Sequence, residues 1–197
     1  MILRTTGSDV AEQAQTGGYL DTPYHRLDCQ AFVEKVLEDL GVRKPDGTVY
    51  NWKGSNSMYR NYIRWRGTVK ECLDKFGCIP LGAFVFIIKY DGGEVNRGYH
   101  DGLGNATHVG LFVGSNYTGC QCMDSQPTGG VQYRKLSLFT HVGLMDMIDY
   151  SSASLPPEEP KPEALTAIHT IRNPDSSDED CLKALETLTK YLKEVKL

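Results

Sequence analysis

The stretch TPYHRLDCQAFVEKVLEDLGV, residues 22–42, decides how the whole chain is interpreted. Its second half, residues 28–40, has apolar residues at the 3.6-residue spacing of an amphipathic helix, namely Phe32, Val33, Val36, Leu37 and Leu40. Gly41 is placed to end this helix. Asp28 is placed to cap its first turn, where a carboxylate accepts hydrogen bonds from free backbone N–H groups. The stretch therefore predicts a helix that begins with an acid and a cysteine, Asp28 and Cys29.

The remaining elements divide into helices in the first part of the chain and strands in the second. Further helices are expected at residues 8–15, 57–65 and 68–76. Strand-like runs separated by turn residues follow at residues 83–90, 108–113, 119–123, 131–134 and 142–150. This order indicates an α+β fold with an antiparallel sheet.

After residue 150 the composition changes. Residues 151–164 are rich in proline, serine and glutamate, which is typical of a linker. Ser177 and Asp180 match a capping box before a last helix, whose apolar residues repeat at spacings of four and three. We therefore expect a domain at residues 1–150, a linker at 151–164 and a helical tail at 165–197. The tail helix either docks on its own domain or forms a homodimer.

Composition and charge exclude several classes of partner. The chain has 197 residues, 40% of them hydrophobic, and a net charge of -4, which suits a globular domain with a core. The acidic balance and the lack of a basic stripe argue against a nucleic-acid partner. No run approaches the ~18 apolar residues of a membrane helix, and the first residues contain no apolar signal region. We expect either a chain that is synthesised in soluble form in the cytoplasm or one whose export signal was removed.

Metal and cofactor sites are not predicted. The six cysteines lack the close CxxC pairs of a zinc site. Apart from Cys29, they are expected to be small buried hydrophobes, at positions 72, 78, 120, 122 and 181. The acidic loop 91–105 lacks the spacing of an EF-hand calcium loop and is expected to be a solvated hairpin loop.

Cys29 has the position of a reactive thiolate, because the positive end of a helix dipole favours thiolate over thiol. A catalytic cysteine also needs a base and a group that orients the base. His108, which opens the run HVGLFVG, is expected to face a cleft, and His25 is placed to line the same cleft. Asp124 is expected to reach the back of His108 from the adjacent strand. The open alternatives are that Cys29 is a small buried side chain and that Asp124 only caps the turn at residues 125–126.

Together these residues resemble the NlpC-type peptidoglycan endopeptidases, papain-like cysteine peptidases of bacterial cell-wall remodelling and phage lysis. The resemblance covers residues 8–150 and rests on TPY (22–24), DCQAFV (28–33), GAFVFI (82–87), HVGLFVG (108–114) and MDSQPTGGV (123–131). The segment NWKGSNSMYRNY (51–62) further resembles a subgroup found in prophages of Gram-positive bacteria. Two departures from the family pattern occur, at residues 30–31 and at residue 124. Gln30-Ala31 replaces Ser-Gly, and Asp124 stands where histidine is usual and Asn or Gln occurs sometimes.

The resemblance implies a papain-like fold, in which the nucleophile lies at a helix N-terminus packed on a central antiparallel sheet. It implies Cys29 as the nucleophile, His108 as the base and Asp124 as the orienting residue. It also places Tyr24 beside the nucleophile, where its hydroxyl holds the substrate or the oxyanion. The open alternative is that Tyr24 is a half-buried ring packed on the helix. The predicted substrate-binding residues are Tyr24, Asp28 and His25.

The implied partners are the stem peptides of peptidoglycan, often cut between D-Glu and the diamino acid, and the implied place of action is the cell wall. No cofactor, nucleic acid or membrane insertion is implied. Two other functions remain open. One is an amidase or acyltransferase on the same scaffold, and the other is a catalytically silent wall-binding or phage-tail module.

Overall fold

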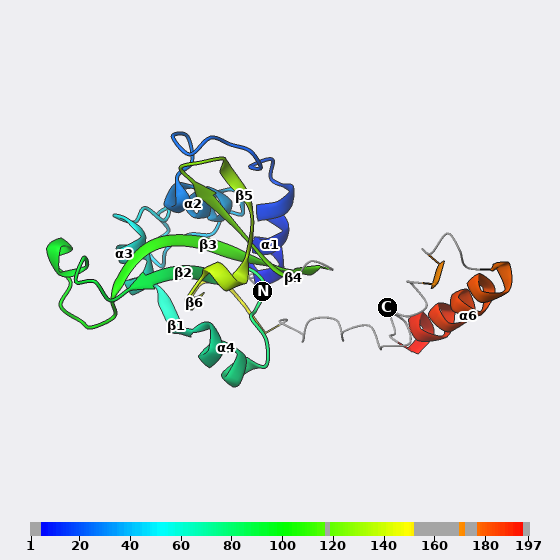
Figure 1. The fold of residues 1–197 in the computed structure, drawn as a ribbon. Coiled ribbons are helices and arrows are strands. Elements are labelled where there is room, and N and C mark those ends of the chain that lie inside the picture. The colour runs from blue at the N-terminus through cyan, green and yellow to red at the C-terminus, as the bar shows by residue number, and fades with distance from the viewer. Residues whose placement is uncertain (1–4, 117–118, 152–169, 172–176, 195–197) are drawn as a thin grey trace. The chain divides into compact units, whose positions relative to one another are not determined.

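A computed structural model of the chain describes residues 5–116, 119–151, 170–171 and 177–194. The chain divides into two compact units, Met1–Ser154 and Leu155–Leu197. Nearly all of the predicted linker, residues 152–164, lies outside the described residues. Each unit is therefore considered by itself (Figure 1).

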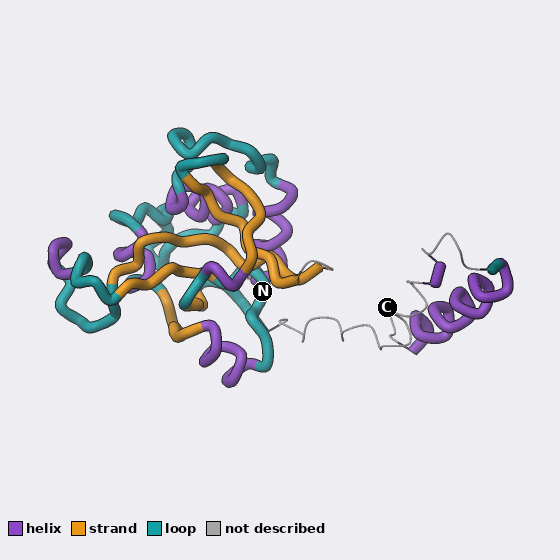
Figure 2. Tube along the Cα trace, in the orientation of Figure 1, coloured by secondary structure: helices purple, strands orange, loops and turns teal. Residues whose placement is uncertain are grey.

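The first unit has an α+β fold, as predicted (Figure 2). Its helices are α1 (Gly7–Thr16), α2 (Cys29–Asp39), α3 (Ser55–Arg60) and α4 (Val69–Phe76), with short 3-10 helices η1 (Val95–Arg97) and η2 (Leu136–Leu138). Its strands are β1 (Ile63–Thr68), β2 (Phe84–Lys89), β3 (Asn105–Asn116), β4 (Gly119–Gln126), β5 (Gly130–Lys135) and β6 (His141–Met145).

The six strands form one sheet in the order β1-β6-β2-β3-β4-β5, and every neighbouring pair is antiparallel. Strand β3 lies between β2 and β4 and carries His108 close to its start. Strand β4 carries Asp124 close to its end. Because antiparallel neighbours run in opposite directions, the start of β3 lies beside the end of β4. The topology therefore brings the backbone segments that carry His108 and Asp124 close together.

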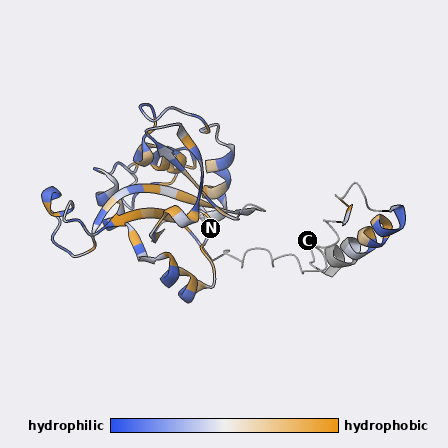
Figure 3. Cartoon of the chain, in the orientation of Figure 1, coloured by the Kyte–Doolittle hydropathy of each residue, from blue (hydrophilic) through white to orange (hydrophobic). Residues whose placement is uncertain are grey.

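Helix α2 is held by its apolar face. Phe32, Val33, Val36 and Leu37 are fully buried, and the helix packs on β3, β4 and α1. Burial of each such side chain stabilises the fold by about 1.5–3 kcal/mol. Figure 3 shows that the central strands, β2 above all, are the most apolar part of this unit. The first residue of α2 is thus fixed on the core by several buried contacts.

One predicted helix was wrong in its second half. The helix expected at residues 57–65 ends at Arg60, and residues 63–68 form the edge strand β1. Tyr62 has a φ of 63°, which a continuing right-handed helix does not allow. The run Ile63-Arg64-Trp65-Arg66 alternates apolar and charged residues, which is the two-residue period of a strand. The other strands were located correctly, but β6 stops at Met145, short of the predicted residue 150.

In the second unit, helix α6 (Asp178–Glu194) follows Ser177. The Asp180 N–H donates to the Ser177 hydroxyl at 3.2 Å, which is the predicted helix cap. Homodimerisation through this helix stays a prediction. Among the described residues, no helix combines the length and the apolar character that crossing a bilayer requires.

Candidate active site

Cys29 is the first residue of α2, as its position in the sequence predicts. Asp28 caps the helix, because its Oδ1 accepts a hydrogen bond from the Ala31 N–H at 2.8 Å. The first N–H groups of a helix have no partner within the helix, and they carry the positive end of its dipole. The Cys29 thiol is 9% exposed and therefore lies just below the surface, at a point that favours negative charge.

His108 and Asp124 are in direct contact. The Nε2 atom of His108 lies 2.6 Å from Oδ2 of Asp124. Asp124 is 1% exposed, and the His108 ring stacks on Phe139 with 6.1 Å between ring centroids. The carboxylate therefore lies where it can orient the imidazole, and its role in catalysis stays a prediction.

The electrostatics of His108 link it to Cys29 as well. Burial opposes the charged imidazolium, but hydrogen bonds to Asp124 and Cys29 outweigh it and raise the pKa of His108 to about 9. Since Nε2 bonds to Asp124, the ring has Nδ1 left for the cysteine sulfur. The three residues are thus connected in the order Cys29, His108, Asp124, and the arrangement favours a thiolate beside an imidazolium.

A glycine lets the two strands approach at this point. Gly110 on β3 pairs with Asp124 on β4. A Cβ atom at Gly110 would lie 2.7 Å from the Met123 carbonyl oxygen and 3.0 Å from the Asp124 Cβ, both too close for ordinary contact. Any larger residue at position 110 would therefore push Asp124 away from its place behind His108.

Two further residues hold the Asp124 carboxylate, and the sequence reasoning missed both. Gln126 Nε2 donates to Asp124 Oδ2 at 2.7 Å and lies 3.0 Å from His108 Nε2. Arg134 on β5 places its Nε 3.6 Å from Asp124 Oδ1. The spacing of two residues between Asp124 and Gln126 in one strand was a usable signal, because it puts both side chains on one face. Arg134 belongs to another strand, and no local pattern marked it.

Tyr24 lies beside Cys29 on a segment that is fixed to β5. Val131 donates its N–H to the Thr22 carbonyl at 3.0 Å, and the Asp21 N–H donates to the Val131 carbonyl at 2.9 Å. Gly130 has a φ of 70°, and a Cβ there would lie 2.1 Å from the Thr22 oxygen. Position 130 therefore requires glycine for two reasons, its backbone angle and the close approach of residue 22.

The Tyr24 hydroxyl is placed to donate a hydrogen bond. Burial, then the negative charges of Cys29 and Asp28, and then the hydrogen bond to Cys29 raise the pKa of Tyr24. The phenol consequently stays protonated at neutral pH beside the Cys29 sulfur. The Ser125 hydroxyl donates to the Leu27 carbonyl, which also ties the segment before Cys29 to β4.

The other two predicted substrate-binding residues lie at the surface. Asp28 is exposed and caps α2, and His25 is exposed on the segment that precedes it. Their roles in binding substrate stay predictions. Among the described residues, no group of three or more His, Cys, Asp or Glu side chains is arranged to hold a metal ion.

The remaining cysteines differ in their exposure to solvent more than expected. Cys72, Cys78 and Cys122 are buried, and burial raises the pKa of each thiol, to about 12 for Cys72. The prediction was wrong for Cys120, which is exposed close to the start of β4, and for Cys181 in α6, which is partly exposed. The cause is that a strand end and a surface helix leave small side chains accessible.

These differences lead to a labelling prediction. Iodoacetamide at neutral pH and limiting dose should alkylate Cys29 before the other five cysteines, because thiolate character controls the rate. Cys120 is the strict comparison, since it is more accessible but lacks an imidazole partner of this kind. Peptide mapping by mass spectrometry measures the order, and alkylation of Cys120 ahead of Cys29 would contradict the assignment.

Comparisons of the chain with protein-family models, with curated proteins and with solved structures find no match.

Proposed function

We propose that this chain is a papain-like cysteine peptidase that hydrolyses peptide bonds in the stem peptides of peptidoglycan. The observation that supports the chemistry best is the 2.6 Å contact of His108 with Asp124, on an imidazole whose pKa is raised in part by Cys29 at the start of α2. The substrate class rests on the resemblance of the five sequence motifs to NlpC-type enzymes.

The first half of the reaction forms a thioester. The Cys29 thiolate attacks the carbonyl carbon of the scissile bond, and the carbonyl oxygen becomes an oxyanion. The Cys29 N–H, at the helix N-terminus, and the Tyr24 hydroxyl are the donors placed to stabilise that charge. His108 gives its proton to the leaving nitrogen, so the C–N bond breaks and a free amine departs.

The second half releases the acid. His108, now neutral, accepts a proton from water, and the resulting hydroxide attacks the thioester carbonyl. The C–S bond breaks, the new carboxylic acid leaves and gives its proton to solvent, and the Cys29 thiolate and the His108 imidazolium are restored. Asp124 keeps its place throughout, and its negative charge stabilises the imidazolium each time it forms.

Product analysis distinguishes this reaction from its alternatives. Purified muropeptides of known structure should be incubated with the protein and analysed by mass spectrometry. Hydrolysis within the stem peptide gives two fragments, with one new amine and one new carboxylate. Release of the whole peptide from its sugar would identify an amidase, and a mass gain on an acceptor amine would identify an acyltransferase. Binding without any product would identify a silent wall-binding module.

The pH dependence tests the role of Asp124. The pKa of His108 is raised from about 6.5 to about 9, so the imidazolium is present below that value and is lost as the pH rises through it. The alkaline limb of kcat/KM is therefore expected near pH 9. Asp124→Asn removes the negative charge, so this limb should move to lower pH, whereas the acid limb should move less.

Because Cys29 and His108 titrate as a pair, the measured limbs belong to the pair and not to single residues. A full pH profile of kcat/KM for both proteins, with melting temperatures, is the required measurement. An unchanged profile together with a lowered melting temperature would show that Asp124 only stabilises the fold.

A further inference from the structure

Strand β3 contains a β-bulge immediately before His108. Ile87 on β2 pairs with His108, whereas the next residue, Ile88, pairs with Ala106, so Thr107 is an extra residue on β3. In a regular strand Ala106 and His108 would lie on the same face. Their partners Ile87 and Ile88 are neighbours in sequence and lie on opposite faces. The extra residue therefore places Ala106 and His108 on opposite faces of the sheet, and the bulge is the backbone segment that directly precedes His108.

The residue before the bulge is held by side chains of α3. The Asn56 side-chain oxygen accepts a hydrogen bond from the Ala106 N–H at 2.9 Å, and the Ser55 hydroxyl donates to the Ala106 carbonyl at 2.6 Å. Asn56 Nδ2 also donates to Asn105 Oδ1 at 2.8 Å. Asn56 is 1% exposed. Both backbone polar groups of Ala106 are thus bonded to one short helix.

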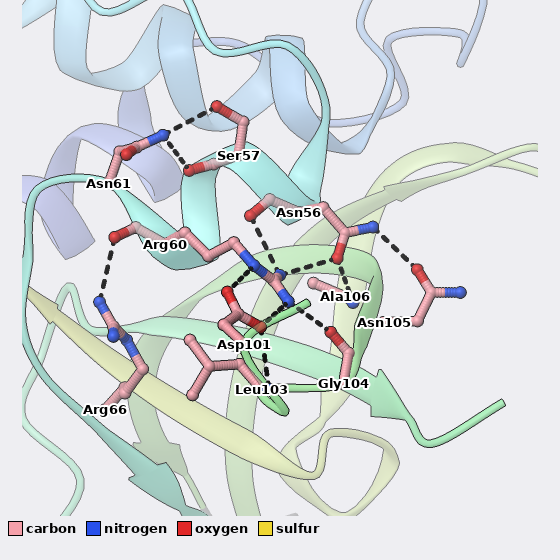
Figure 4. Close-up of polar contacts among 10 residues, drawn as sticks. All are labelled: Asn56, Ser57, Arg60, Asn61, Arg66, Asp101, Leu103, Gly104, Asn105 and Ala106. Carbon is pink, nitrogen blue, oxygen red and sulfur yellow. Dashed lines mark hydrogen bonds and ion pairs between the residues drawn. The ribbon is translucent and has the colours of Figure 1, made fainter. Parts of the chain in front are cut away.

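The orientation of the Asn56 amide is fixed in turn by Arg60 (Figure 4). Arg60 Nη1 donates to Asn56 Oδ1 at 3.0 Å, while Nε and Nη2 bind the Asp101 carboxylate at 2.6 and 2.8 Å. Nη2 also donates to the Gly104 carbonyl at 2.9 Å. A flipped amide would place an NH2 group against two donors, so only one orientation of Asn56 fits.

We propose that Asn56 is a positioning residue for His108, because its carboxamide holds the β-bulge that directs the imidazole toward Asp124 and Cys29. Asn56 touches neither substrate nor sulfur and acts only through Ala106 and the bulge. The catalytic part of this inference rests on the proposed function, but the orientation of His108 is measurable without any substrate. The competing explanation is that Asn56 only satisfies buried backbone groups and stabilises the fold.

The test compares Asn56→Ala in α3 with Asn61→Ala at the C-terminal cap of the same helix. Asn61 bonds only to Ser57, its neighbour one turn earlier (Figure 4), so its loss removes hydrogen bonds from α3 without touching β3. The first readout is an NMR titration of the His108 ring, assigned by comparison with His108→Gln. The charged groups that set this pKa are Cys29 on α2, Asp124 on β4 and, through Asp124, Arg134 on β5. The second readout is kcat/KM on a stem peptide.

In Asn56→Ala the pKa of His108 should fall from about 9 toward its ordinary value, because the ring loses its aligned contact with Asp124. The value of kcat/KM should fall by about 10–100-fold, as expected for a small misplacement of a catalytic group. Asn61→Ala should change neither the pKa of His108 nor kcat/KM. Asn56→Asp keeps an acceptor for the Ala106 N–H, so most of the upward shift in the pKa of His108 should remain in this variant.

The proposal would be overturned if the pKa of His108 in folded Asn56→Ala equals that of the wild type. It would also be overturned if Asn56→Ala and Asn61→Ala shift that pKa equally. If Asn56→Ala does not fold, Asn56→Ser decides, because it keeps a polar side chain but is one atom too short to replace the Asn56 oxygen that accepts from the Ala106 N–H. A lowered pKa of His108 in that variant supports the proposal, and an unchanged one overturns it. If the wild type cleaves no stem peptide, the proposed function fails, while the titration still decides whether Asn56 positions His108.

Discussion

Replacing Cys29 with serine is expected to abolish turnover of a soluble stem peptide, with kcat/KM lowered by about 10⁴-fold or more. A hydroxyl in this place stays protonated at neutral pH, so the helix N-terminus and His108 have no anion to stabilise. Serine is close to cysteine in size, and the side chain lies at the edge of the core, so the fold should be retained. Initial rates followed by chromatography of the products give the measurement.

The matched control for this change is Cys120→Ser. Cys120 is exposed on β4, and it is not part of the proposed catalytic group, so its loss should leave kcat/KM unchanged. Residual activity of Cys29→Ser within tenfold of the wild type would mean that another residue is the nucleophile.

Replacing His108 with alanine is expected to lower kcat by about 10²–10⁴-fold, the usual contribution of a positioned acid–base group. The loss has two parts, because the thiolate loses its cationic partner and the leaving amine loses its proton donor. His108 is the buried histidine that contacts both Cys29 and Asp124. Steady-state kinetics with the same stem peptide, together with a melting curve, separate this loss from unfolding.

Two other histidines provide comparisons for His108. His100 is exposed in the loop before β3, and His100→Ala should leave the rate unchanged. His25 is exposed near Tyr24, and His25→Ala should cost far less than His108→Ala. Equal losses for His25→Ala and His108→Ala would refute the assignment of the base.

The sequence predicted the parts of the site that local patterns encode. The apolar period of α2 and the cap at Asp28 located Cys29 at the helix start, and both features are present. The runs around His108 and Asp124 predicted adjacent strands, and antiparallel pairing then placed the two side chains together. Such features depend on neighbours within one or two turns or on a single strand pairing, so periodicity and turn residues are sufficient to find them.

The sequence did not reveal the contacts that fix the fine geometry. The bulge at Thr107 adds one residue to β3, and alternation of apolar and polar residues cannot show it in a strand buried on both faces. Arg134 reaches Asp124 from another strand, so only the register of β4 and β5 brings the two together. The edge strand β1 was missed because its four alternating residues directly follow a helical segment.

The most direct test of the proposed function is mass spectrometry of purified peptidoglycan after digestion by the wild type and by Cys29→Ala. The wild type should release fragments with new amino groups from within the stem peptides, and Cys29→Ala, folded to the same degree, should release none. Equal release by both proteins, or no cleavage of stem peptides by the wild type, would contradict the proposed function.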